Sequence, residues 1–306
     1  MSSPGPFSLV GADSGPKVDL SGVAVVVHEP RTEVRRMMRL ALHEFGIGTV
    51  NDVADFAALQ EQVRANPFDL LIAEMEAPDG DVCGLLRAIR YGDIGRDPFV
   101  PAVLSAWNPS VGLVVKAVNA GADDLLGKPA SAGRLLERVR MVARSRRPFV
   151  AACDYVGPER RKNPARIKPG DLIEVPNVLA NKAGGSWQAQ AHREALDDAV
   201  VRVHRALSER FAEKLELLAE EFVEGLDDSA AEKRAATLET LRSLADNLEA
   251  HSRRIALPTL ARYADGLRRL VKAFQGNVTP ATMKRNKALL REIAGSIAAE
   301  ARRHAG

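Results

Sequence analysis

The amino-acid sequence predicts an α/β domain with a doubly wound, five-stranded parallel sheet, followed by an all-α helical bundle. In the first half of the chain, short apolar runs alternate with amphipathic stretches, which is typical of a parallel sheet covered by helices. Polar or turn-forming residues follow each run, as expected for strands buried on both faces. From residue 187 onward, apolar residues recur at spacings of three and four, so this half is expected to be nearly all helix.

The run from Phe68 to Pro78 is the centre of the predicted sheet. An unbroken apolar stretch leads to Glu74, and Pro78 then closes the run. The carboxyl ends of strands in an open parallel sheet face the ligand crevice. Glu74 is therefore expected at the mouth of a pocket, where a carboxylate is better suited to chemistry or metal binding than to stabilising a core.

Three further strand ends bring polar side chains to the same edge of the sheet. The first predicted strand ends at His28 and Glu29, the fourth ends at Ser105, and the fifth leads to Lys128. Because parallel strands end at one edge, these side chains are expected to lie near Glu74. The strands are expected at residues 23–27, 49–50, 68–74, 99–104 and 124–126, with helices at 34–45, 57–65, 82–91, 111–120 and 135–142.

This arrangement resembles the receiver domain of two-component response regulators, over roughly residues 23–146. In that family, the first strand ends in two acids, the third in a phospho-accepting aspartate, the fourth in Ser or Thr, and the fifth in Lys-Pro. The matching stretches here are Val25–Pro30, Leu71–Pro78, Leu104–Ala106 and Gly121–Pro129. The resemblance implies phosphorelay signal transduction, Mg²⁺ at the crevice and a cis Lys128–Pro129 bond.

Three residues depart from the family pattern. Glu74 stands at the phosphoacceptor position, His28 replaces the first acid of the pair, and Leu125 stands where the family usually has a switch aromatic. One extra methylene moves the carboxylate by on the order of an ångström, and such a misplacement can cost ~100-fold in rate. Imidazole is also a poor ligand for Mg²⁺, which prefers hard oxygen atoms. We therefore expect a degenerate receiver with no cofactor, in which Glu29 and Glu74 bind Mg²⁺ weakly at most.

Three interpretations of Glu74 remain open. Its longer side chain could mimic the phosphorylated state by placing charge near Ser105 and Lys128. It could instead be an inert acid that pairs with Lys128, or an atypical phosphoacceptor. Two of its neighbours have structural alternatives as well: His28 as a hydrogen-bonded packing residue, and Ser105 as a cap for the following loop.

The second half contains a weaker resemblance, to histidine phosphotransfer bundles. The stretches Ala245–Ala250 and Leu257–Leu260 resemble the central motif of that family. Asp246 falls at the position of the reactive histidine and Glu249 at that of the following lysine, so neither transfer residue is present. The alternative is an ordinary antiparallel bundle, or one with a longer exposed first helix, in which Asp246 is exposed and pairs with Arg242.

The chain is expected to have four parts. Residues 147–186 are rich in Pro, Gly, Lys and Arg, and they predict an extended basic connector, either solvated or in contact with phosphate or an acidic surface, with 171–176 as an edge strand. The N-terminal stretch lacks a basic start followed by an apolar core, so it is not expected to be a signal peptide. The parts are a flexible leader (1–22), a receiver-like domain (23–146), the connector (147–186) and a helical domain (187–306), for phosphotransfer or dimerisation.

Net charge, cysteine count and the length of the apolar stretches limit the classes of function that the chain can have. The 306 residues carry a formal charge of +3, which does not by itself indicate nucleic acid, and the two cysteines fit a reducing compartment. No apolar stretch is long enough to span a membrane, so a cytoplasmic protein is expected. No nucleophile with its base, metal cluster or phosphate loop is recognisable, so an enzyme is not expected.

The leading hypothesis is a two-component signalling protein that acts by docking to a histidine kinase or another response regulator, with a homodimer also compatible. The first alternative is a DNA-binding response regulator that uses the basic connector and helical half. The second is an active phosphorelay with Glu74 as acceptor.

Overall fold

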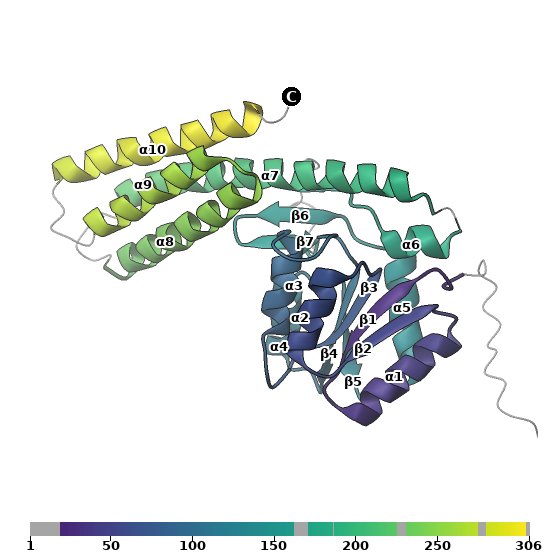
Figure 1. Ribbon diagram of the computed structural model, residues 1–306. Helices are drawn as coiled ribbons and strands as arrows, with labels where there is room; N and C mark the ends of the chain where they lie inside the picture. Colours follow the sequence, from purple (N-terminus) through teal and green to yellow (C-terminus); the bar gives the residue numbers. More distant parts are fainter. Residues whose placement is uncertain (1–18, 162–170, 186, 225–230, 275–279, 304–306) are drawn as a thin grey trace, which may run out of the picture.

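The computed structural model describes residues 19–161, 171–185, 187–224, 231–274 and 280–303, without some side chains at the helix ends of the second half. The expected leader up to residue 18 and the connector residues 162–170 lie outside this part of the chain. The described residues form a layered α/β domain, a small β-hairpin and an elongated array of helices (Figure 1).

The first domain contains the predicted five-stranded parallel sheet, with strand order β2-β1-β3-β4-β5. The register pairs Glu74 with Ser105 and His28 with Ala73, so the strand ends lie side by side. The fourth strand runs to Trp107, three residues past the expected range of 99–104. The strands are β1 (Ala24–His28), β2 (Thr49–Val53), β3 (Leu70–Glu74), β4 (Ala102–Trp107) and β5 (Asp124–Lys128).

Helices cover both faces of this sheet, which confirms the doubly wound fold. One core contains side chains of α1 and α5, and the core on the other face contains side chains of α2, α3 and α4. Asp55, Ser110 and Ser131 cap α2, α4 and α5 by accepting a backbone N–H three residues later. The helices are α1 (Thr32–Glu44), α2 (Phe56–Ala65), α3 (Val82–Arg90), α4 (Val111–Asn119) and α5 (Ala132–Arg144).

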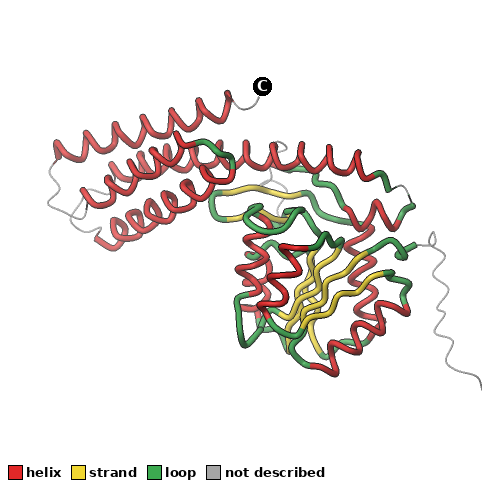
Figure 2. The backbone as a smooth tube through the Cα atoms, in the orientation of Figure 1, coloured by secondary structure: helices red, strands yellow, loops and turns green. Residues whose placement is uncertain are grey.

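The described parts of the connector, residues 147–161 and 171–185, include folded elements, contrary to the extended chain expected from the composition. It forms an antiparallel hairpin of β6 (Phe149–Ala152) and β7 (Tyr155–Pro158), followed by the short helix α6 (Val178–Ala183) (Figure 2). Of the expected edge strand 171–176, only Ile173 pairs, through two 2.8 Å backbone hydrogen bonds with Phe149. The Phe149 side chain is buried, and the apolar area removed from water favours a folded hairpin over a solvated chain.

A buried ionic cluster fixes the hairpin to the amino-terminal edge of the sheet. Asp123 accepts hydrogen bonds from Arg90 (3.0 Å) and Arg146 (2.7 Å), and Arg160 donates to its backbone oxygen (2.7 Å). Burial raises the pKa of the Asp123 carboxyl, but the two guanidinium groups outweigh this effect and leave the pKa below its ordinary value. Both of these arginines also lie over the ring of Phe149. Arg146 and Arg160 are therefore structural residues and not part of a solvated connector.

The second half is helical, as predicted, and consists of two antiparallel helix pairs. Helix α7 packs along α10, and α8 packs along α9. With 36 residues, α7 spans ~54 Å at 1.5 Å per residue, and its first part lies against the hairpin (Figure 1). Both expected arrangements are thus present, a bundle and a long first helix. The helices are α7 (Ala189–Glu224), α8 (Ala231–Arg254), α9 (Pro258–Phe274) and α10 (Pro280–Arg303).

The end of α8 contacts the sheet domain directly. The Arg254 guanidinium donates two hydrogen bonds to the Asp93 carboxylate, at 2.6 and 2.7 Å, and lies 4.5 Å from the centre of the Tyr91 ring. Tyr91 and Asp93 follow α3, so this contact joins the helical half to the first domain without the connector.

Candidate functional site

The predicted site residues converge at the carboxyl edge of the sheet. His28 ends β1, Glu74 ends β3, Ser105 lies near the end of β4 and Lys128 ends β5, and Glu29 directly follows β1. All five residues are at most 4% exposed. The Lys128–Pro129 bond is cis, as the resemblance implies.

Lys128 lies between two carboxylates. Its ammonium group pairs with both Glu29 and Glu74. Glu74 also accepts a hydrogen bond from the Ser105 hydroxyl (3.3 Å) and one from the backbone N–H of Glu76 (3.1 Å). Every oxygen of the Glu74 carboxylate therefore has a protein donor, and this satisfies a buried charge that would otherwise be costly.

An aromatic and a basic side chain lie beside this ion cluster. The Trp107 ring centre is 5.2 Å from the Lys128 ammonium nitrogen, and the Arg31 guanidinium lies 4.2 Å above the same ring. The backbone N–H of Arg31 donates to the Glu29 carboxylate at 3.0 Å. The connection after β1 and the last residue of β4 thus bring Arg31 and Trp107 together next to the cluster. Neither residue was identified from the sequence, although the position of Trp107, two residues after Ser105, was a usable signal.

His28 is fully buried at the end of β1. Burial lowers the pKa of His28, against smaller opposing contributions from Asp79, Glu29 and a backbone hydrogen bond with Glu74, so the imidazole is neutral near pH 7. A neutral imidazole adds no oxygen ligand to the site.

The donor set does not fit Mg²⁺. In the part of the chain that the structure describes, no group of three or more His, Cys, Asp or Glu side chains is arranged to hold a metal ion. Glu29 and Glu74, the two expected ligands, both pair with the Lys128 ammonium, which supplies the positive charge between them. A magnesium ion needs several oxygen ligands in near-octahedral geometry, and here it would have to displace this ammonium.

Leu125 lies on β5, half-buried, and packs against the apolar core on the α2–α3–α4 face of the sheet. It has no polar group, so it cannot make the hydrogen bonds of a tyrosine at that position.

Asp246, the position that resembles a phosphotransfer histidine, lies on the exposed face of α8, with 61% of its side chain accessible. It pairs with Arg268 of α9 at 2.8 Å, and the same guanidinium contacts Glu249. These two carboxylates hold the pKa of Arg268 above its ordinary range. The expected partner was Arg242, which instead pairs with Glu239 on its own helix. The two helices α8 and α9 bring Asp246 and Arg268 together, which helical spacing within α8 could not predict.

A serine–histidine pair in the helical half was not noticed in the sequence. The Ser208 hydroxyl and His251 Nε2 are 2.9 Å apart and buried. Burial lowers the pKa of His251 to about 3, and nearby His204 and Arg254 contribute to this shift. The imidazole is therefore a weak base near neutral pH. Its Nδ1 has no partner among the described residues that would orient the ring for catalysis. The geometry is that of a structural hydrogen bond between α7 and α8.

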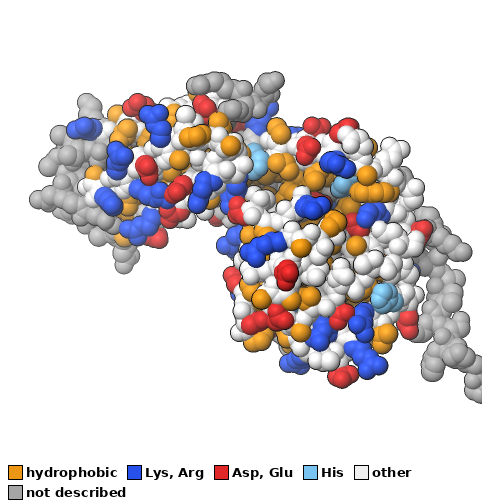
Figure 3. All heavy atoms as spheres, in the orientation of Figure 1, with side chains coloured by type: hydrophobic (Ala, Val, Ile, Leu, Met, Phe, Trp, Pro, Cys, Tyr) orange, Lys and Arg blue, Asp and Glu red, His pale blue; other side chains and the backbone are white. Residues whose placement is uncertain are grey.

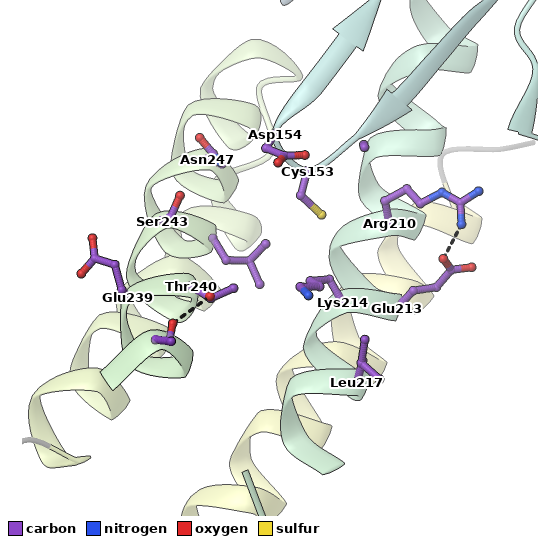
Figure 4. A pocket seen from close by; sticks show the side chains of 13 residues that line it. Cys153, Asp154, Arg210, Glu213, Lys214, Leu217, Glu239, Thr240, Ser243 and Asn247 are labelled. Atoms are coloured by element: carbon purple, nitrogen blue, oxygen red, sulfur yellow. Dashed lines mark hydrogen bonds and ion pairs between the residues drawn. The ribbon is translucent and has the colours of Figure 1, made fainter. Parts of the chain in front are cut away.

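A cavity of about 880 Å³ lies between the hairpin tip, α7 and α8 (Figure 4). Arg210 and Lys214 on α7 face polar side chains of α8 across it, and Cys153 and Asp154 lie at the hairpin end. Burial and the Asp154 carboxylate raise the pKa of Cys153 to about 12, so the thiol is unreactive. Acids and bases both line the cavity, and charge alone selects no ligand for it.

Comparisons with known proteins agree with the fold of the first domain. Residues 25–140 match the family model of the response regulator receiver domain. The response regulator PilR of Pseudomonas aeruginosa is 30% identical over 124 residues, which cover 40% of this chain and 26% of PilR. The KDP operon transcriptional regulatory protein KdpE of Escherichia coli is 30% identical over 120 residues, which cover 39% of this chain and 51% of KdpE. The chain thus spans between about a quarter and a half of these relatives' lengths.

Solved structures give similar matches over the same part of the chain. A Francisella response regulator receiver domain is 21% identical and covers 40% of this chain and 96% of its own, with a TM-score of 0.36. The chemotaxis response regulator CheY4 of Vibrio cholerae is 21% identical and covers 39% of this chain and 98% of its own, with a TM-score of 0.35. Within the described residues, no helix is both long enough and apolar enough to cross a membrane.

Proposed function

Residues 25–140 are a response regulator receiver domain, which indicates two-component signalling, and from this premise we propose that the chain is a cytoplasmic, non-phosphorylatable member that acts by docking. Receiver domains interact with histidine kinases or with other regulators, and we propose the same partner class here. We propose that the helical half has no enzymatic activity. It would act as a binding module that carries the receiver or restricts it.

The observation that carries the proposal is the position of Lys128 between Glu29 and Glu74. Phosphoryl transfer needs an acceptor oxygen in line with the donor and a metal that neutralises the developing charge. Here the Glu74 oxygens are held by the Lys128 ammonium, the Ser105 hydroxyl and a backbone N–H. Because the ammonium pairs with both carboxylates, the site has a fixed charge arrangement that does not depend on a phosphoryl group.

The charge distribution gives little support to the DNA-binding alternative. Arg146, just before the connector, pairs with the Asp123 carboxylate. In the connector, Arg160 donates to the Asp123 backbone oxygen, and Arg161 pairs with Glu159. On the face drawn in Figure 3, positive and negative side chains are interspersed over the described residues. A DNA-binding surface normally concentrates Lys and Arg on one face.

Docking is tested by cross-linking the full chain to histidine kinases and response regulators that co-purify with it, then mapping the cross-links onto the two halves. We expect cross-links on the receiver with a kinase or a regulator, unchanged in yield when acetyl phosphate and Mg²⁺ are added. The phosphorylation-independent mechanism is refuted if acetyl phosphate changes the yield and the Glu74→Gln variant does not respond. Steeply salt-dependent retention on DNA, without such a protein partner, would favour the DNA-binding alternative.

One exposed substitution gives a matched control for the cross-linking experiment. Glu33→Gln removes one exposed carboxylate from the first turn of α1, outside the ion cluster. It should leave both the cross-link yield and its insensitivity to acetyl phosphate as in the parent chain.

A further inference from the structure

A second cavity lies where the receiver domain meets the helical half. It has a volume of about 240 Å³ and is bounded by the end of α3, the loop before β4, the middle of α7 and the end of α8. It is distinct from the ion cluster, because the cluster lies at the carboxyl edge of the sheet and this loop precedes β4 at the other edge. Small-molecule sites are commonly found at such domain interfaces.

The lining of this cavity carries positive charge only. Arg90, Arg96 and Arg254 line it, and no Asp or Glu is among the described lining residues. Three acids beside the lining already have partners among the described residues. Asp123 pairs with Arg90 and Asp93 with Arg254. The Asp97 carboxylate, next to Arg96 in the chain, accepts the backbone N–H of Phe99 at 2.7 Å. Arg96 is exposed, and none of the described residues forms an ion pair or a hydrogen bond with its guanidinium. One cation is thus available to an incoming anion.

The rest of the lining is mostly apolar, with one unsatisfied polar atom. Val200, Val203 and Leu207 of α7 line one wall, and Phe99 contributes an aromatic ring. His204 also lines the cavity, and its buried Nδ1 has no hydrogen-bond partner among the described residues. An unsatisfied buried nitrogen costs free energy that a bound polar group would recover.

We propose that this cavity binds a small molecule that carries one phosphate or carboxylate group on a compact apolar body. The anionic group pairs with Arg96, and the apolar part contacts the α7 side chains. Because the lining comes from the receiver and from two helices of the second half, an occupied cavity bridges the two. The ligand must be small, since the volume is just below the ~300–1,000 Å³ of typical ligand pockets. This site is independent of the docking function proposed above.

The test is a calorimetric titration of the full chain with phenyl phosphate, benzoate and inorganic phosphate at constant ionic strength, because salt screens exposed charges. We expect phenyl phosphate or benzoate to bind, and phenyl phosphate to bind more tightly than inorganic phosphate. The Arg96→Glu variant should bind at least about tenfold more weakly, a loss of the size of one ion pair. Val200→Phe, which fills the half-buried α7 wall, should also abolish binding of both aromatic probes.

Arg36→Glu on the exposed face of α1 makes the same charge change away from the cavity and should bind like the parent. Circular dichroism of each variant confirms that it is folded, so weak binding is not mistaken for unfolding. The proposal is overturned if no aromatic probe binds below about 10 mM, or if Arg96→Glu and Arg36→Glu bind equally. Inorganic phosphate that binds as tightly as phenyl phosphate would refute the apolar part of the site.

Discussion

Removing the ammonium group of Lys128 should leave two buried carboxylates without their counter-ion. Lys128→Met keeps much of the side-chain volume and deletes the charge that pairs with both Glu29 and Glu74. These two glutamates are 1% and 3% exposed, so water cannot replace the lost partner without opening the site.

The size of the effect follows from burial and charge. Breaking a buried ion pair by removing one partner typically costs about 3–5 kcal/mol. Repulsion between the two remaining carboxylates adds to this, since unit charges 4 Å apart interact by about 4 kcal/mol at an effective dielectric constant of 20. We therefore expect Lys128→Met to lower the free energy of unfolding by at least ~3 kcal/mol at pH 7.

The assay is urea denaturation of both proteins at pH 7, with and without MgCl₂. Mg²⁺ should stabilise Lys128→Met and leave the parent unchanged, because the variant frees two carboxylates for a cation. Lys116→Met is the matched control. Lys116 is exposed and lies 3.8 Å from Asp81, so its loss should cost less than about 1 kcal/mol.

A loss below about 1 kcal/mol at pH 7, the size expected for an exposed pair, would contradict this expectation. Equal stabilisation of parent and variant by Mg²⁺ would contradict it as well.

Three other substitutions test the junction and the helical half by urea denaturation. Asp123→Asn should cost about 3–5 kcal/mol, because it removes the shared partner of two buried guanidinium groups, and a loss below about 1 kcal/mol would contradict this. Gly157→Ala should cost about 1–3 kcal/mol, because a Cβ atom there would lie 2.8 Å from the Cα of Gly121, whereas Gly295→Ala, with open space, should be neutral or stabilising. The folded pKa of His251 is about 3 and its ordinary value 6.5, so only the unfolded chain takes up this proton as the pH falls below 6.5. Its contribution should lower stability by roughly 2 kcal/mol between pH 7 and pH 5, and His251→Phe should flatten that dependence.

The strand ends were predictable from the sequence because their pattern is local. An apolar run followed by a charged residue marks both the strand and the edge at which it ends, and this was enough to bring Glu74, Ser105 and Lys128 together. The pairing of Lys128 with Glu74 was one of the expected interpretations. The position of Arg31 beside Trp107 was not predicted, because it depends on the path of the loop after β1 and on how far β4 extends.

The connector shows where sequence reasoning stops. Its basic residues are expected to be solvated because residues 144–168 hold eight Lys and Arg against only two acids, Asp154 and Glu159. In the structure, Arg160 donates to the backbone oxygen of Asp123 instead. Arg146, just before the connector, pairs with the Asp123 carboxylate, which also pairs with Arg90. Likewise, Asp246 pairs with Arg268 across two helices. Such long-range ion pairs arise from packing and have no local signature.

The most direct test of the central claim is phosphoryl incorporation into the full chain. The parent protein is incubated with acetyl phosphate and Mg²⁺, and intact-mass spectrometry then detects any added phosphoryl group. The account predicts no incorporation, because the Lys128 ammonium and the Ser105 hydroxyl hold the Glu74 carboxylate. A stoichiometric, acid-labile phosphoryl group on Glu74 would contradict it.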